Sequence, residues 1–120
     1  MALSTNFGVD YFVAGRAFDQ VSGDAVLVDV TQEQIFVGLI DAAGHGPRAH
    51  AVSQAACTFL EENKNEKLPV LMQALHEKLR GTRGGVAIIG KLDVTQLQLT
   101  YVGVGNITLR KFGIVSTREI

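Results

Sequence analysis

Polar and apolar residues alternate in short runs near both ends of the chain, which is typical of half-buried strands. The pattern predicts a weak strand at residues 7–14 and clearer strands at residues 21–30 and 34–40. Only a short polar turn joins the last two, whereas a parallel pair would need a crossover of roughly a dozen residues. We therefore expect these two strands to form an antiparallel hairpin.

The middle of the chain has the 3.6-residue period of helices instead. Pro47 suits the first position of a helix, and this helix is expected to end near Asn63. After a polar link at residues 64–67, a second helix is expected to run to Gly81. The apolar positions that define the helices are Ala49, Val52, Ala55, Ala56, Phe59 and Leu60 in the first, and Leu68, Leu71, Met72, Leu75 and Leu79 in the second.

Strand-like patterns return in the last third of the chain. We expect a buried strand at residues 85–92, a hairpin partner at 97–104 and a further strand at 107–112 after the Gly105-Asn106 turn. The order of elements is therefore strands, two helices, strands. This order predicts an α+β fold in which helices cover one face of a mostly antiparallel sheet.

The composition supports one folded domain of 120 residues, since 47% of them are hydrophobic. The formal charge is -1 and basic residues do not cluster, which argues against nucleic acid or an anionic membrane as partner. No apolar run is long enough to span a bilayer, and the first ten residues do not resemble a signal peptide. We therefore expect a cytoplasmic protein. The lone Cys57 excludes an internal disulfide and is interpreted as a small buried hydrophobe.

Asp24 and Asp41 are the most informative polar residues, because each lies at the end of a predicted strand with glycine nearby. A carboxylate at the mouth of an apolar strand is costly to hold unless a cation meets it. Two carboxylates from adjacent strands make the hard-oxygen site that Mg²⁺ or Mn²⁺ prefers. Each aspartate alone can also be an ordinary turn or cap residue. Together they predict part of a hydrolase centre with two divalent ions about 3.5–4 Å apart.

The segment Asp41-Ala42-Ala43-Gly44-His45-Gly46-Pro47 leads from this site into the first helix. Its glycines allow a tight turn, and the helix N-terminus adds a partial positive charge for an anion. His45 is either a general acid or a residue that packs within the loop. His50 and His76 are expected to be ordinary surface residues of the two helices.

A second glycine-rich segment, Gly81-Thr82-Arg83-Gly84-Gly85, joins the second helix to the next strand. Its glycines suit the end of a helix and the start of a strand, so a purely structural role is one interpretation. Arg83 carries forked donors that match a phosphate group. The other interpretation is therefore that Arg83 binds phosphate.

Four blocks of the sequence, taken in order, resemble the PPM serine/threonine phosphatases, and in particular the bacterial branch of the sporulation stage II E and stressosome phosphatases. The likeness covers about residues 7–112. Each block alone is weakly specific, whereas the ordered set is fairly specific. The blocks are Ser22-Gly23-Asp24, Asp41-Ala42-Ala43-Gly44-His45-Gly46, Thr82-Arg83-Gly84-Gly85-Val86 and Tyr101-Val102-Gly103-Val104-Gly105-Asn106.

The resemblance implies the family's α/β sandwich, with a metal centre at one end of two antiparallel sheets and helices packed outside. It implies that Asp24 and Asp41 bind two Mn²⁺ or Mg²⁺ ions, with Asp41 as the bridge. The backbone carbonyl of Ala42 would face a metal, at a position where the family usually has glycine. The implied reaction is hydrolysis of phosphoserine or phosphothreonine by a metal-activated water. The implied substrates are partner-switching regulators in stress-response signal transduction, either anti-sigma-factor antagonists or stressosome components.

The sequence departs from the family's pattern in two places. The arginine that precedes the first aspartate in larger relatives is not matched, because Asp19 and Gln20 lie in that region and Arg16 is not clearly equivalent. The later Ser-Asp-Gly block, which supplies a further metal aspartate, does not occur before Ile120. We therefore expect either a fragment of a phosphatase domain or a shortened protein with an incomplete site. In both cases an open sheet edge would favour pairing with another chain. A non-catalytic regulatory or interaction module is the alternative function.

Overall fold

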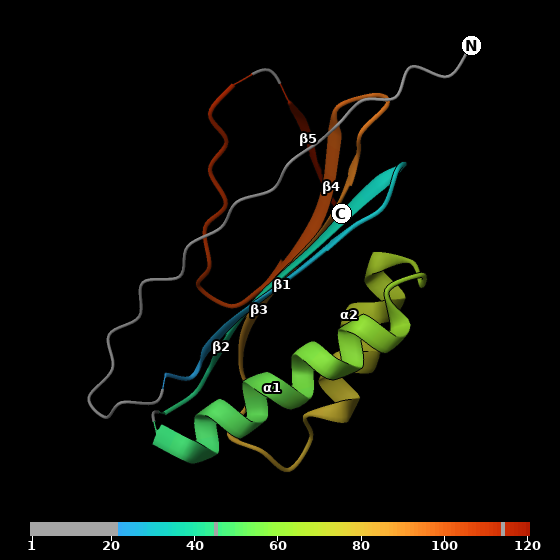
Figure 1. The fold of residues 1–120 in the computed structure, drawn as a ribbon. Coiled ribbons are helices and arrows are strands. Elements are labelled where there is room, and N and C mark those ends of the chain that lie inside the picture. The colour runs from blue at the N-terminus through green and yellow to red at the C-terminus, as the bar shows by residue number, and fades with distance from the viewer. Residues whose placement is uncertain (1–21, 45, 114) are drawn as a thin grey trace.

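The computed structural model describes residues 22–44, 46–113 and 115–120. These residues form one five-stranded sheet with two helices on one of its faces (Figure 1). The predicted α+β arrangement is therefore confirmed, and the second sheet implied by the resemblance is not found among the described residues. The elements in chain order are β1 (Asp24–Val30), β2 (Gln34–Ala42), α1 (Gly46–Asn63), α2 (Leu68–Lys78), β3 (Gly85–Asp93), β4 (Gln98–Val104) and β5 (Ser116–Glu119).

The sheet has the strand order β1-β2-β3-β4-β5, and the pairs β1–β2, β2–β3 and β3–β4 are antiparallel, as expected. The prediction of a strand at residues 107–112 is wrong, because the strand that pairs with β4 is β5, and it runs parallel to β4. A parallel partner requires a connection that returns along the sheet. Residues 105–113 and residue 115 belong to that connection, and none of them is in a strand.

Both helices match their predicted positions. Pro47 lies in the first turn of α1, and α1 ends at Asn63 as expected. The second helix ends at Lys78, before the predicted Gly81, which instead has a φ of 90° in the turn that follows. None of the helices in the described part of the chain has the length and apolar character needed to cross a bilayer. The predictions for residues 7–14, Arg16 and His45 lie outside the described residues.

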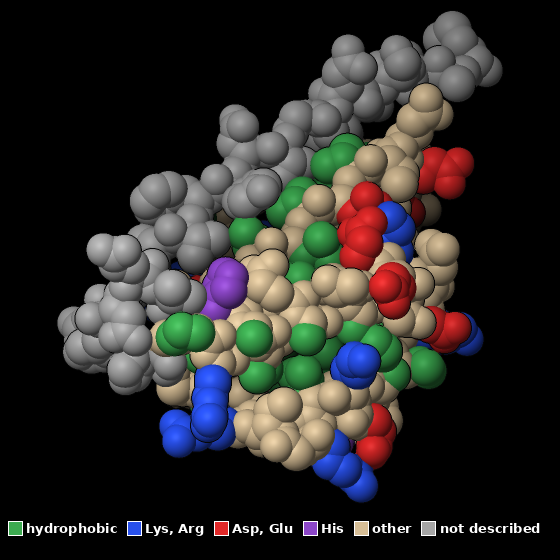
Figure 2. All heavy atoms as spheres, turned by 60° about the horizontal axis from the view of Figure 1, so that its bottom comes forward, with side chains coloured by type: hydrophobic (Ala, Val, Ile, Leu, Met, Phe, Trp, Pro, Cys, Tyr) green, Lys and Arg blue, Asp and Glu red, His purple; other side chains and the backbone are tan. Residues whose placement is uncertain are grey.

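The core lies between the sheet and the two helices. Alternate residues of β2 point toward the helices, and Gly38 among them leaves room for α1, since a Cβ there would lie 3.3 Å from the Leu60 side chain. A band of hydrophobic side chains remains visible on the helical side of the molecule (Figure 2). The largest fully buried apolar side chains are Phe36, Ile40, Leu60, Leu71 and Ile89.

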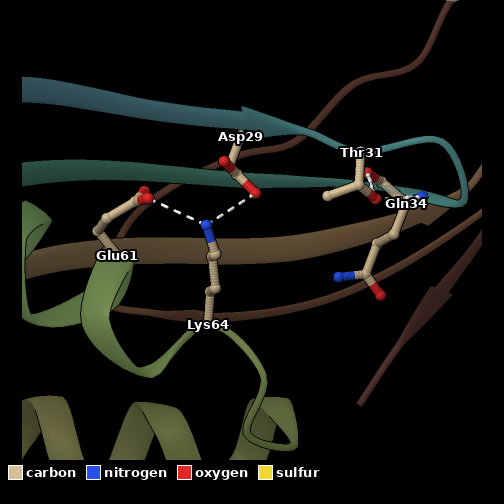
Figure 3. Close-up of polar contacts among 5 residues, drawn as sticks. All are labelled: Asp29, Thr31, Gln34, Glu61 and Lys64. Carbon is tan, nitrogen blue, oxygen red and sulfur yellow. Dashed lines mark hydrogen bonds and ion pairs between the residues drawn. The ribbon is translucent and has the colours of Figure 1, made fainter.

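Polar contacts fix the far end of α1 against β1 (Figure 3). Lys64 Nζ lies 3.1 Å from a carboxylate oxygen of Asp29 on β1 and 3.0 Å from one of Glu61 on α1. The turn between β1 and β2 is closed next to this bridge, where the Thr31 hydroxyl donates to the carbonyl of Gln34 at 2.9 Å. These groups are partly exposed, so they orient the helix more than they stabilise the fold.

Candidate metal centre

The four sequence blocks converge at one end of the sheet. Asp24 at the start of β1 pairs with Asp41 near the end of β2, and Asp41 pairs in turn with Val86 at the start of β3. The fourth block ends β4 at the same end, since a Cβ on Gly105 would lie 2.7 Å from the Cβ of Val86. Blocks that are far apart in the sequence, from Asp24 in the first to Gly105 in the last, therefore gather at one end of the sheet.

Asp24 and Asp41 are directly opposite each other across β1 and β2. The amide of Ala42 donates to the carbonyl of Gly23 at 3.1 Å, so the neighbouring residue pair, Gly23 and Ala42, is a hydrogen-bonded pair of the sheet. The pair formed by Asp24 and Asp41 is therefore of the non-hydrogen-bonded kind, in which side chains come closest, with Cβ atoms about 4.5–5.5 Å apart. Both side chains point away from the helices, because the next residue pair, Ala25 and Ile40, is buried on the helical face.

The surroundings of Asp24 raise the pKa of its carboxyl. Asp24 is half-buried, and this burial raises the pKa of its carboxyl above the usual value. A hydrogen bond with Asp41 and repulsion from its negative charge raise the pKa of Asp24 further. The site thus concentrates negative charge, and a cation between the two carboxylates would relieve that repulsion.

The segment before β1 is held by α1. Asp24 donates its backbone N–H to the Ser22 hydroxyl at 3.0 Å. Ser53, which is fully buried on α1, donates its hydroxyl to the carbonyl of Gly23. His50 Nδ1 lies 3.3 Å from the carbonyl oxygen of Ser22. The first half of α1 therefore fixes the backbone that presents the Asp24 carboxylate.

Sequence reasoning missed the role of Ser53 and treated His50 as an ordinary surface residue. His50 is exposed, yet its ring contacts the backbone that leads into β1. Ser53 stands four residues after Ala49 on the apolar side of the helix, and a buried hydroxyl almost always has a hydrogen-bond partner. That position was the available signal for Ser53.

β3 approaches β2 closely beside Asp41. A Cβ on Gly85 would lie 2.8 Å from the Cα of Ala42 and closer still to the carbonyl oxygen of Asp41. Only glycine therefore fits at this position without moving a strand. The amide of Ala43 donates to the carbonyl of Gly84 at 2.8 Å, which continues the contact past the end of β2.

Arg83 lies in the loop between α2 and β3, close to the glycine-rich loop that follows β2. Its Nη1 lies 3.5 Å from the position of a Cβ built on Gly44, whose φ is 89°. The loop is braced by Thr82, whose hydroxyl donates to the carbonyl of Leu79 at 2.6 Å and accepts from the amide of Gly84 at 3.0 Å. The exposed guanidinium is therefore held at the same end of the sheet as the two aspartates.

The donor set fits a hard divalent cation. Asp24 and Asp41 offer carboxylate oxygens on one face of the sheet, and the carbonyl oxygen of Ala42 lies 3.0 Å from the position of a Cβ on Gly23, toward the start of β1. Within residues 22–44, 46–113 and 115–120, no group of three or more His, Cys, Asp or Glu side chains is placed to hold a metal. Two carboxylates still suit Mg²⁺, which is usually bound through one or two carboxylates and keeps several water ligands.

Comparisons with known proteins find a similar phosphatase. Over 87 residues, which are 72% of this chain and 44% of the relative, the chain is 25% identical to the phosphoserine phosphatase RsbX of Bacillus subtilis (strain 168). A crystal structure of RsbX in complex with magnesium superposes with a TM-score of 0.71 at 24% identity, over 78% of this chain and 47% of that one. The chain resembles RsbX in sequence and in fold. No protein-family model matches it.

A second solved structure is similar at higher identity. It belongs to work described as "The bacterial stressosome: a modular system that has been adapted to control secondary messenger signaling". The TM-score is 0.64 at 36% identity, over 69% of this chain and 43% of that chain. The chain thus spans less than half the length of each protein that it matches here.

Proposed function

We propose that this chain is part of a metal-dependent PPM-type phosphatase that hydrolyses phosphoserine or phosphothreonine in a regulatory protein. The observation that carries the proposal is the facing pair Asp24 and Asp41, in a chain that resembles a phosphoserine phosphatase. The raised pKa of Asp24 supports a site built to receive positive charge.

The metal ligands in this proposal are Asp24, Asp41 and the backbone carbonyl of Ala42, with Asp41 bridging two Mg²⁺ or Mn²⁺ ions. The presence of magnesium in a solved RsbX structure supports the choice of metal. Bound ions of this kind polarise a phosphoryl oxygen and lower the pKa of a bound water.

The chain's own residues would give the substrate access to the site and orient its phosphate. Asp41 is exposed, so a phosphorylated side chain can reach it from solvent. Arg83 would orient the phosphate through its forked donors, from a loop that hydrogen bonds of Thr82 already hold in place.

We further propose that the sheet described above is one layer of the two-sheet PPM sandwich. Its face opposite the helices carries apolar side chains that alternate with the helix-facing ones, including Val26, Leu39 and Ile88. Such a face is normally covered by another layer. The substrate class in this proposal is a partner-switching or stressosome regulator, which the similarity to a protein of a stressosome study supports.

A non-catalytic regulatory or interaction module is the second candidate function. The observation that favours it is that the similar stressosome structure is described as part of a modular system adapted to control signalling. In this case Asp24 and Asp41 would remain in place, but the chain would not hydrolyse a phosphorylated substrate.

The two candidates are separated by measuring phosphate release. We expect the chain to release phosphate from a phosphoserine peptide and from para-nitrophenyl phosphate with Mn²⁺ or Mg²⁺, and not with chelator. Asp24→Ala and Asp41→Ala should abolish release, whereas Glu62→Ala, at an exposed position of α1, should not. Retained activity in both aspartate variants would refute the phosphatase proposal. A folded wild-type chain with neither Mn²⁺ binding nor turnover would favour the second candidate.

A further inference from the structure

A groove of about 610 Å³ opens between the first turns of α1 and the loop that leads into β3. It starts at Ala43 and Gly44, two and three residues after Asp41. Its volume is well above that of a phosphate group and falls in the range of sites that hold drug-sized ligands, about 300–1,000 Å³. The groove therefore has room for several residues of a substrate protein beside the candidate metal centre. The residues that line it are Ala43, Gly44, Pro47, Arg48, Ala49, Ala51, Val52, Gly81, Thr82 and Arg83.

The charge of this groove is opposite to that of the chain as a whole. The chain has 12 acidic and 11 basic residues. Among the residues that the structure describes, Arg48 and Arg83 line the groove and no acidic residue does. In Figure 2 the visible acidic side chains lie away from the side where α1 begins, whereas basic side chains are visible on both sides. The partial positive charge of the α1 N-terminus adds to the same field.

The two arginines of the groove differ in their surroundings from the arginine beside it. Arg80, directly before Gly81 of this loop, donates to a carboxylate oxygen of Glu77 at 2.9 Å. Neither Arg48 nor Arg83 forms an ion pair with any carboxylate that the structure describes. The hydrogen bonds of Thr82 brace one wall of the groove, and α1 provides the other. The groove thus presents two guanidinium groups, one from the first turn of α1 and one from the loop before β3.

We infer that this groove binds an acidic segment of the phosphoprotein substrate next to the phosphorylated residue, and that Arg48 is a specificity-determining contact for it. The inference rests on the proposed function, because the occupant is the substrate of the metal centre. Charge complementarity selects the occupant: two arginines without a lining carboxylate favour aspartate or glutamate side chains. In this inference Arg83, whose Nη1 lies beside Gly44, meets the phosphate, and Arg48, on the first turn of α1, meets the acidic side chains next to it.

The test measures binding without turnover. Two phosphoserine peptides, one flanked by aspartates and one with asparagines in their place, are titrated into the full chain in excess chelator, and dissociation constants are determined. Arg48→Ala should weaken binding of the acidic peptide by about two- to fivefold, as expected for an exposed ion pair, and leave the neutral peptide unchanged. Rising salt should reduce the preference for the acidic peptide. Arg118→Ala, on exposed β5, is the matched control and should bind both peptides like the wild type.

Each outcome decides the inference. Equal weakening of both peptides by Arg48→Ala, no weakening of either, or the same loss in Arg118→Ala would overturn it. Circular dichroism of each variant separates unfolding from lost contact, and Arg48→Gln repeats the charge removal with a longer side chain. Binding is measured in chelator and is therefore independent of phosphatase activity. If the chain preferred the acidic peptide but had no phosphatase activity, only the proposed function would be refuted. Activity that does not depend on flanking charge would refute only the groove.

Discussion

Asp24 and Asp41 lie 17 positions apart in the sequence and directly opposite each other in the sheet. The backbones of these two residues form no hydrogen bond with each other. In pairs of this kind the facing side chains come closer than in hydrogen-bonded pairs. The fold thus places two like charges close together on adjacent strands. Its stability without metal and its affinity for metal should therefore change in opposite directions when one charge is removed.

Asp24→Asn should stabilise the metal-free chain at neutral pH. The pKa of Asp24 in the folded chain lies above the usual value of 3.8, so the folded state binds this proton more tightly than the unfolded state does. The corresponding stability is fully present below 3.8 and is lost as the pH rises through the raised pKa. Urea unfolding in chelator at several pH values should show this loss in the wild type and in Glu62→Gln, but not in Asp24→Asn. Equal pH profiles for all three would contradict the account.

Gly85→Ala should disturb the site through the backbone. The added methyl group would lie 2.8 Å from the Cα of Ala42 and would push β3 away from β2 beside Asp41. Overpacking of this kind costs about 1–3 kcal/mol in the free energy of unfolding. Chemical denaturation measures the loss, and Mn²⁺ titration should show a weaker site. At Gly103 the nearest atom to an added Cβ is 3.4 Å away, so Gly103→Ala should be tolerated and serves as control.

Ser53→Ala should remove the hydrogen bond by which α1 holds the backbone next to Asp24. Its hydroxyl is fully buried and donates to the carbonyl of Gly23, and a single hydrogen bond of this kind contributes about 1 kcal/mol to stability. We expect that loss in the free energy of unfolding, together with a reduced affinity for Mn²⁺. Thr58→Ala, at an exposed position of the same helix, should do neither. If the two variants behaved alike, the anchoring role of Ser53 would be wrong.

Arg83→Ala should reduce the use of phosphorylated substrate. A charge-assisted hydrogen bond to phosphate corresponds to a loss of roughly tenfold or more in kcat/KM. Arg83→Lys should restore part of this loss, because lysine keeps the charge but not the fork. Steady-state kinetics with a phosphoserine peptide measures the effect, with Arg110→Ala, at an exposed position after β4, as control. Unchanged kinetics in Arg83→Ala would leave the α2–β3 loop with its structural role alone.

Much of the fold follows from local patterns in the sequence. The β1–β2 hairpin and both helices were predicted because the hydrophobic period and Pro47 act locally. The end of the sheet was not predicted, since β5 pairs in parallel with β4 and reaches it only through a long connection. Its four residues are all exposed and carry no apolar pattern, so nothing local marks them as a strand.

The candidate site was predictable only in part for the same reason. The two aspartates could be identified because each lies at the end of a predicted strand. The predicted hairpin brings the two strands side by side, so their facing positions followed from it. The contacts of Ser53 with Gly23 and of Gly85 with Asp41 are long-range, and they depend on how α1 and β3 pack against the hairpin. The roles assigned to Asp24, Asp41, Ala42 and Arg83 remain predictions that the experiments above test.

The most direct test of the metal centre is calorimetric titration of Mn²⁺ into the metal-free chain, compared with Asp24→Asn and Asp41→Asn. The account predicts saturable binding by the wild type, loss of binding in both variants, and retained binding in Glu62→Gln. Folded wild-type protein that binds no Mn²⁺, or variants that bind it as tightly as the wild type, would contradict the shared cation on which the proposed function depends.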